Sequence, residues 1–140
     1  MHLPVAETEI VVPFHDIDLL EVVWHGHYLR YLEVARGALL DLIDYNYPQM
    51  RASGYAWPVI EVKLRYPRPA RYGQRLRVQA RMTEFDPRLC IEYLITDAAT
   101  GERLTKGRTV QVAVEIATGE MQFGSVEPLV RRLREAACIA

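Results

Sequence analysis

The segment HDIDLLEVVWHGHY, residues 15–28, concentrates side chains that can move protons or attack a carbonyl carbon. A carboxylate can serve as a general base on water or as a nucleophile, and an imidazole can orient or transfer a proton. A His-x-His sequence beside carboxylates can also bind zinc, so the segment permits either a metal-free hydrolytic site or a metal site. The side chains concerned are His15, Asp16, Asp18, Glu21, His25 and His27.

A helix is predicted directly after this segment, over residues 27–44. Apolar residues recur there at spacings of three and four, which gives the helix one apolar face that must be buried. Glu33 and Arg36 lie off that face and are expected to form an ion pair. Pro48 cannot continue a helix, so the helix is expected to end within residues 44–48. The apolar face consists of Tyr28, Leu32, Ala35, Leu39 and either Leu42 or Ile43.

The rest of the chain alternates apolar and polar residues, which predicts β-strands separated by turns. The predicted strands are residues 5–14, 59–66, 75–82, 88–96 and 104–116. A last hairpin is expected to close at residues 117–120. Ser125 is predicted to cap a short C-terminal helix with Leu129, Val130 and Leu133 on its apolar face. This order of elements predicts an α+β fold, in which an antiparallel sheet packs against one long helix.

Length and composition limit the class of protein. A chain of 140 residues, 50% hydrophobic and 25% charged, is expected to form a single domain, residues 1–140. It has no apolar run long enough to span a membrane and no signal sequence, so a cytoplasmic location is expected. Cys90 and Cys138 are expected to be reduced and unreactive.

Charge is distributed unevenly along the chain, although the net charge is only −1. Residues 1–50 carry eight acidic and two basic side chains, a net −6, whereas residues 51–81 carry one acidic and eight basic, a net +7. The basic stretch is a candidate anion site. No aromatic–basic motif of an RNA-binding module accompanies it, so nucleic acid is not an expected partner.

Two stretches resemble the hotdog-fold acyl-CoA thioesterases, in particular the group around 4-hydroxybenzoyl-CoA thioesterase. DIDLLEVVWHGHY followed by LRYLEVAR is similar to a family pattern of Asp-x-Asp, a Val-Val-aromatic run, and a Tyr that opens a helix carrying Glu and Arg. LRYPRPARYGQRLRV is similar to a strand–turn–strand of the family. The resemblance implies a hotdog fold, a curved antiparallel sheet wrapped around one long helix. It also implies a homodimer or homotetramer with active sites between subunits.

The resemblance further implies roles for individual residues. Asp18, the second acid of DID, matches the catalytic carboxylate of the family and would act as nucleophile or general base. The backbone N–H of His25 would polarise the thioester carbonyl at the helix N-terminus, and its ring would orient the substrate or Asp18. Asp16 is expected to bond the loop backbone. Relatives commonly have Gly where this chain has Glu21, so Glu21 is expected to enter the pocket as a second acid or to point to solvent.

Five further residues are candidates for substrate binding. Four of them are candidates for the phosphates of coenzyme A, because cationic side chains, and the planar donor fork of arginine above all, bind phosphate. These four are Arg65, Arg68, Arg71 and Lys106. Tyr28 is a candidate for the acyl pocket, although an apolar helix stripe is first of all core. The arginines expected on a solvated strand face alone are Arg75, Arg77 and Arg81.

The expected function is therefore that of an acyl-CoA thioesterase without metal, cofactor or membrane contact. Two other functions stay open on the sequence. A hotdog hydratase or dehydratase would act on related thioesters, but its Asp-x-Asn-Pro-x-His and His-Phe-Pro-Gly signatures are absent. A non-catalytic acyl-CoA-binding or partner-docking domain would keep the arginines and the pocket but would not need Asp18.

Overall fold

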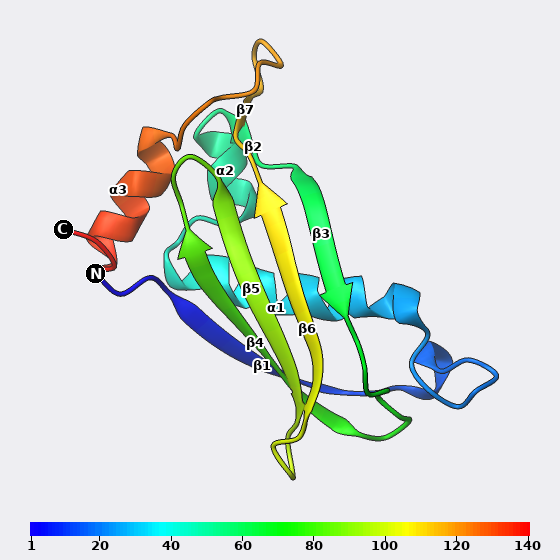
Figure 1. The fold of residues 1–140 in the computed structure, drawn as a ribbon. Helices are drawn as coiled ribbons and strands as arrows, with labels where there is room; N and C mark the ends of the chain where they lie inside the picture. Colours follow the sequence, from blue (N-terminus) through cyan, green and yellow to red (C-terminus); the bar gives the residue numbers. More distant parts are fainter.

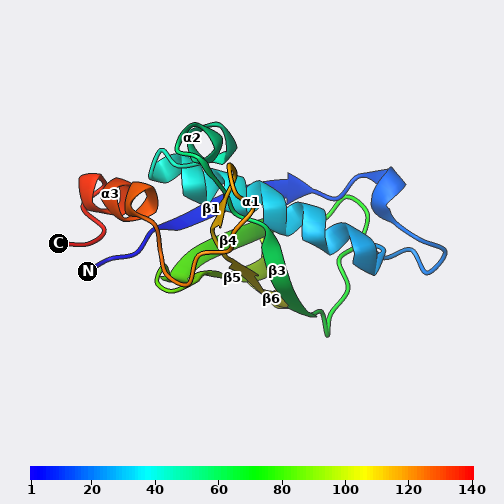
Figure 2. The same cartoon turned by 90° about the horizontal axis from the view of Figure 1, so that it is seen from above.

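The fold is built on one curved antiparallel sheet with a long helix across one face (Figure 1). The computed structural model describes residues 1–140. Five strands lie in the order β1-β4-β5-β6-β3, and helix α1 (Tyr28–Leu42) covers one side of them (Figure 2). The predicted α+β hotdog architecture is thereby confirmed. The strands are β1 (Val5–Val11), β3 (Val59–Arg65), β4 (Arg75–Glu84), β5 (Leu89–Asp97) and β6 (Arg103–Gln111).

The face of α1 that packs on the sheet is the predicted apolar face. Its first four members are at most 2% exposed: Tyr28, Leu32, Ala35 and Leu39. Ile43 completes the face, because it is buried whereas Leu42 is exposed. The residues of β4 that point to the helix side are those predicted by alternation, Leu76, Val78, Ala80 and Met82, and all four are buried. This interface forms the core that fixes the start of α1 relative to the sheet.

The opposite, outer face of the sheet carries the solvated arginines predicted for β4. Each of these arginines pairs with a carboxylate of a neighbouring strand. The predicted Glu33–Arg36 ion pair also forms, within α1. Exposed ion pairs of this kind each add little stability, about 0–1 kcal/mol. The pairs are Arg75–Glu9 at 3.8 Å, Arg77–Glu7 at 3.7 Å, Arg81–Glu92 at 3.0 Å and Glu33–Arg36 at 3.3 Å.

Strand β3 lies at an edge of the sheet, and this changes the burial predicted for it. Alternation over residues 59–66 predicted one buried apolar face, yet Ile60 and Val62 are 56% and 43% exposed. Leu64 alone of β3 packs against the core. β3 pairs with β6 on one side only, so its other edge has no strand beside it.

The prediction of one strand over residues 104–116 is wrong. β6 ends at Gln111, and β7 (Val114–Glu115) pairs with β2 (Tyr55–Ala56) in a separate two-stranded sheet. The chain leaves the main sheet after Gln111, where the Val112 N–H donates to the carbonyl of Pro58. The hairpin expected at residues 117–120 is present and joins β7 to a bridge at Met121.

Helix α1 ends before Pro48, as predicted, but this proline also starts a helix that the sequence analysis missed. α2 (Tyr47–Ala52) opens with a capping box between Asn46 and Gln49. The Asn46 side chain accepts from the Tyr47 N–H at 2.8 Å, and the Gln49 side chain accepts from the Asn46 N–H at 3.0 Å. Proline is favoured in such a first turn because its missing N–H has no helical partner there.

The predicted cap of the C-terminal helix is wrong. α3 (Glu127–Glu135) begins after Val126 without a side-chain cap, and the buried Ser125 hydroxyl has no hydrogen-bond partner. The predicted apolar face is confirmed at Leu129 and Leu133, which are fully buried, whereas Val130 is only partly buried. None of the helices is long and apolar enough to cross a membrane.

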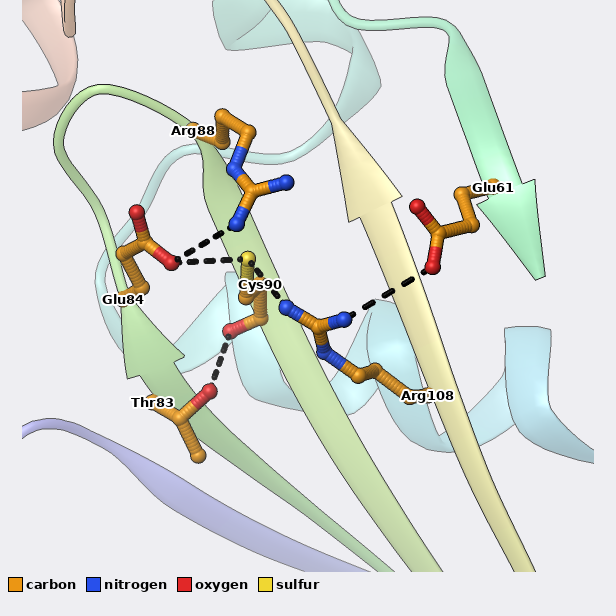
Figure 3. Close-up of polar contacts among 6 residues, drawn as sticks. All are labelled: Glu61, Thr83, Glu84, Arg88, Cys90 and Arg108. Carbon is orange, nitrogen blue, oxygen red and sulfur yellow. Dashed lines mark hydrogen bonds and ion pairs between the residues drawn. The ribbon is translucent and has the colours of Figure 1, made fainter. Parts of the chain in front are cut away.

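Both cysteines are free and buried. Cys90 lies on β5, where its thiol donates to Glu84 at 3.2 Å (Figure 3). Burial, and after it the Glu84 carboxylate, raises the pKa of the Cys90 thiol. Burial alone raises the pKa of the Cys138 thiol. Both therefore stay protonated at neutral pH and are weak nucleophiles.

Candidate active site

Residues 16–24 form a narrow hairpin that leads into the start of α1. The Asp18 N–H donates to the carbonyl of Val22 at 2.9 Å. Asp18 Oδ1 accepts from the Leu20 N–H at 2.8 Å, and Oδ2 has no hydrogen-bond partner. One carboxylate oxygen of Asp18 thus fixes the turn, and the other is free to face a substrate.

The turn that follows β3 holds this hairpin from its other side. Val22 forms a bridge with Arg71, and the Val23 N–H donates to the carbonyl of Ala70 at 2.8 Å. The Ala70 N–H in turn donates to the Tyr28 hydroxyl at 3.3 Å, which links the turn to the first residue of α1. The two stretches that carry the family resemblance therefore lie side by side in the fold.

Asp16 anchors the hairpin to α1. Its carboxylate is fully buried, and Oδ2 accepts from the Arg30 guanidinium and from the Tyr31 hydroxyl. His15 and His27 place Nε2 at 3.6 and 3.9 Å from Oδ1. Burial raises the pKa of Asp16, but the hydrogen bonds from Arg30 and Tyr31 outweigh burial and leave the pKa below its ordinary value. Asp16 is structural, as expected, although it binds two helix side chains rather than the loop backbone.

The helix end beside the hairpin has unpaired N–H groups. A 3-10 turn, His25–His27, precedes α1, and no side chain caps either helix. The backbone N–H groups of His25 and Gly26 donate to no acceptor in the protein. Free N–H groups and the positive end of the helix dipole together attract an anionic oxygen. Asp18 does not accept a hydrogen bond from the N–H groups of His25 and Gly26, so both are available to a ligand.

Aromatic rings surround the His25 side chain. The Tyr66 ring lies parallel to the His25 ring with centroids 6.3 Å apart, and it stacks on Tyr28 at 5.4 Å. Trp24 contacts His25 from another direction, at 5.1 Å. Burial is the main cause that raises the pKa of the Tyr28 phenol, so this group stays neutral. Tyr66 ends a predicted strand, and no pattern in the sequence indicates its contact with His25.

The structure divides the four predicted phosphate contacts between two hollows. Arg68 and Arg71 line one open hollow of about 630 Å³ beside the hairpin. Arg68 also pairs with Glu102 at 3.1 Å but remains 61% exposed. Lys106 does not line this hollow. It lies on β6 opposite Arg65 and faces a second basic hollow on the outer face of the sheet.

Glu21 occupies the tip of the hairpin. Its φ angle is +63°, in the left-handed region that favours glycine. This conformation gives a physical reason for the glycine expected in relatives at this position. The Glu21 side chain is exposed and forms no hydrogen bond or ion pair in the structure.

His15 and His27 approach Asp16 Oδ1 at 3.6 and 3.9 Å, but this set does not form a metal site. No group of three or more His, Cys, Asp or Glu side chains is arranged to hold a metal ion. Asp16 is instead bonded to Arg30 and Tyr31, and the His25 ring stacks on Tyr66.

A third hollow, of about 620 Å³ and mainly apolar, lies toward the other end of α1 and beside α2. Leu40, Met50 and Trp57 contribute to its wall. Gln111 is buried in the same wall, where its Nε2 donates to the Trp57 carbonyl at 2.8 Å and its Oε1 has no partner. The stripe of Tyr28, Leu32 and Ala35 is core, and none of these residues lines the hollow.

A sequence model of the thioesterase-like superfamily matches residues 12–134, which include the hairpin, α1 and the turn after β3. The chain belongs to this superfamily. As a thioesterase-like protein it is a thioester hydrolase.

Known relatives of this thioesterase agree with that assignment. It is 34% identical over 116 residues to a "Putative esterase" of Synechocystis sp., across 82% of this chain and 70% of the relative. It is 29% identical over 82 residues to the "Putative acyl-CoA thioesterase YneP" of Bacillus subtilis, across 59% of each. Its fold superposes on a 1,4-dihydroxy-2-naphthoyl-CoA thioesterase from Synechocystis with a TM-score of 0.80, at 23% identity over 96% of both chains.

Proposed function

We propose that this thioesterase hydrolyses acyl-CoA thioesters at the start of α1. The observation that carries the proposal is the unpaired N–H of His25 beside the hairpin that carries Asp18. The thioester carbonyl would accept from this N–H, which would stabilise the negative oxygen of the tetrahedral intermediate. Asp18 Oδ2 would attack the carbonyl carbon and form a mixed anhydride that water then hydrolyses, or it would take a proton from a water that attacks the carbonyl carbon directly. In either route the C–S bond breaks, coenzyme A leaves as its thiolate, and the acyl group is released as the free acid.

A panel of acyl-CoA substrates with detection of free thiol tests this function. Release of thiol at a rate that depends on the acyl group would support it. A hydratase or dehydratase would change the acyl group without releasing thiol. A binding module would retain acyl-CoA without any chemical change, and either of these results would contradict the proposal.

Charge reversal of both arginines in the 630 Å³ hollow, Arg68→Glu with Arg71→Glu, is expected to raise KM for acyl-CoA more than it lowers kcat. Phosphates distant from the reacting carbon are bound equally in the ground state and the transition state, so their loss weakens binding alone. Steady-state kinetics at two salt concentrations measure the effect. Arg131→Glu with Arg134→Glu on α3 is the matched control, because both arginines are exposed and ion-paired. An unchanged KM would place the phosphates elsewhere, with Lys106 as the next residue to reverse.

A homo-oligomer that joins through the free edge of β3 is expected. An antiparallel pair of β3 strands would set the start of one strand beside the end of the other. Trp57 and Pro58, which line the apolar hollow, directly precede β3, and Tyr66, which stacks on His25, directly follows it. The hollow of one subunit would then adjoin the hairpin and helix end of its partner, where it could receive the acyl group.

Sedimentation at micromolar concentration is expected to show a dimer or tetramer of the 16.1 kDa chain. Ile60→Asp with Val62→Asp should produce monomers and abolish turnover together, because both residues are exposed on the edge strand. A monomeric wild-type protein with full activity would contradict the expected assembly.

A further inference from the structure

The outer face of the sheet contains a hollow of about 460 Å³ whose lining is strongly cationic. We call it the outer-face basin. One carboxylate, Glu92, accompanies its basic side chains. The basic side chains come from β3, β6 and β4, with β5 between the last two, and are Lys63, Arg65, Arg81, Arg103, Lys106 and Arg108.

Strands β3 and β6 place like charges directly opposite one another in this basin. Lys63 is the register partner of Arg108, and Arg65 is the partner of Lys106. All four side chains point to the face away from α1, since residues two apart on a strand share a face. Directly opposed like charges destabilise a sheet. Two such pairs in succession are therefore a cost to the fold that a bound anion would offset.

Carboxylates neutralise only part of this cluster. Glu92 pairs with Arg81 at 3.0 Å, and Glu61 pairs with Arg108 at 3.6 Å. Figure 3 shows Arg108 held between Glu61 on β3 and the Cys90 sulfur on β5. The basic residues that form no ion pair in the structure are Lys63, Arg65, Arg103 and Lys106.

The neighbouring part of the same face behaves differently. Arg75 and Arg77 of β4 each pair with a glutamate of β1. Glutamates of β1 therefore neutralise these arginines of β4, and a surplus of positive charge remains only at the corner formed by β3 and β6. This surplus is local and is not a general property of the surface, because the chain as a whole has a net charge of −1.

We propose that the outer-face basin binds the diphosphate group of a small phosphorylated ligand. Arginine forks and lysine ammonium groups supply charge-assisted hydrogen bonds to several phosphate oxygens at once. The volume of about 460 Å³ is in the range of small-molecule sites, which favours a compact ligand over an extended polyanion. The part of the same face formed by β1 and β4 is charge-balanced by the Arg75–Glu9 and Arg77–Glu7 pairs, so it would not attract a nucleic acid laid across the sheet.

The diphosphate has two possible sources, the coenzyme A part of a substrate and a free nucleotide. Both would present the same chemistry to the basin. The site is separate from the hollow of Arg68 and Arg71, so it can be occupied whether or not those residues bind substrate. Binding can also be measured without turnover, so the proposal can fail or succeed independently of the thioesterase mechanism.

Titration calorimetry with inorganic pyrophosphate at low salt tests the proposal. Wild-type protein is expected to bind, and the double variant Arg65→Gln with Lys106→Gln should bind about tenfold more weakly or worse, because two charge-assisted contacts are lost. The matched control, Arg77→Gln, removes an ion-paired arginine from the same face and should bind like wild type. Absence of binding by wild type, or equal binding by the double variant, would overturn the proposal.

Thermal melting provides a second readout. Without pyrophosphate the double variant should melt no lower than wild type, since it loses a pair of opposed like charges. Pyrophosphate should raise the Tm of wild type and not that of the double variant, because a ligand that binds only the folded state stabilises it. A double variant that melts lower than wild type in the absence of anion would show that the cations serve the fold, and this too would overturn the proposal.

Competition identifies the source of the diphosphate. If it belongs to coenzyme A, coenzyme A should displace pyrophosphate, and the double variant should show a raised KM for acyl-CoA. If it belongs to a free nucleotide, ATP should displace pyrophosphate in the presence of saturating coenzyme A, with KM unchanged. Both results support the diphosphate site, and failure of all these ligands to displace pyrophosphate would refute it.

Discussion

Replacing Asp18 with asparagine is expected to lower kcat by about 10²-fold or more, while the dissociation constant for coenzyme A changes only a few-fold. Contributions of about 10²–10⁴ are typical of a general base. Asparagine cannot act as a carboxylate nucleophile and is not a useful base. The helix end would still polarise the carbonyl, so some activity should remain.

The turn around Asp18 makes this substitution a clean probe of chemistry. Asp18 Oδ1 accepts from the Leu20 N–H at 2.8 Å, and the amide oxygen of asparagine can accept the same hydrogen bond. The hairpin should therefore keep its shape, and only the free oxygen, Oδ2, changes its character. Circular dichroism and a calorimetric titration with coenzyme A would verify that fold and binding are preserved.

Glu21→Gln is the control that decides whether Asp18 is the right carboxylate. Glu21 lies at the exposed tip of the hairpin and its side chain makes no hydrogen bond, so turnover should stay within a few-fold of wild type. If Glu21→Gln abolished turnover while Asp18→Asn retained most of it, the residue assignment would be wrong although the enzyme class would stand.

Asp16→Asn is expected to lower the free energy of unfolding by about 2 kcal/mol at neutral pH. Hydrogen bonds to a charged group contribute about 1.5–3 kcal/mol, and a fully buried carboxylate that binds Arg30 and Tyr31 makes two of them. The expected value is below the sum of two such bonds because the Arg30 side chain is 51% exposed and partly screened by solvent. Urea unfolding measures the change. The control is Glu33→Gln, which removes the surface ion pair with Arg36 on α1 and is expected to lower the free energy of unfolding by less than about 1 kcal/mol.

The pH dependence of the Asp16 contribution has a definite sign. The pKa of Asp16 is lower in the folded protein than its ordinary value of 3.8, so the unfolded state takes up a proton first as the pH falls. The contribution is fully present above the unfolded pKa and is lost as the pH falls through the folded pKa. The stability difference between wild type and Asp16→Asn should therefore shrink from pH 7 toward pH 3. A difference that stays constant or grows would contradict the role of an ionised Asp16.

Much of the fold follows from local pattern, because one buried face dictates the periodicity of α1 and of β4. The alternation in β3 was equally clear, yet Ile60 and Val62 are exposed. Whether an apolar strand face is covered depends on the position of the strand in the sheet, and a single segment does not encode that position. The start of α2 did have a local signal, since Asn46 and Gln49 form a capping box across Pro48.

The candidate site likewise has a part that local sequence indicates and a part that depends on how the elements pack. Spacing within one segment, together with the family resemblance, directs attention to Asp18 and to the helix end at His25. The partners of Asp16 are 14 and 15 residues away on α1, and their arrangement depends on how the hairpin docks on the helix. Charge alone groups Lys106 with Arg68 and Arg71. It lines a different hollow because alternation along β6 turns it to the outer face.

A crystal structure of the Asp18→Asn variant with a hydrolysis-resistant acyl-CoA analogue would test the central claim most directly. The claim is that the thioester carbonyl is bound at the start of α1. The carbonyl oxygen is expected at about 2.7–3.1 Å from the His25 backbone nitrogen, the distance of an oxyanion-hole hydrogen bond. Residue 18 is expected to face the carbonyl carbon. An analogue whose carbonyl lies elsewhere, with the N–H groups of His25 and Gly26 still unpaired, would contradict it.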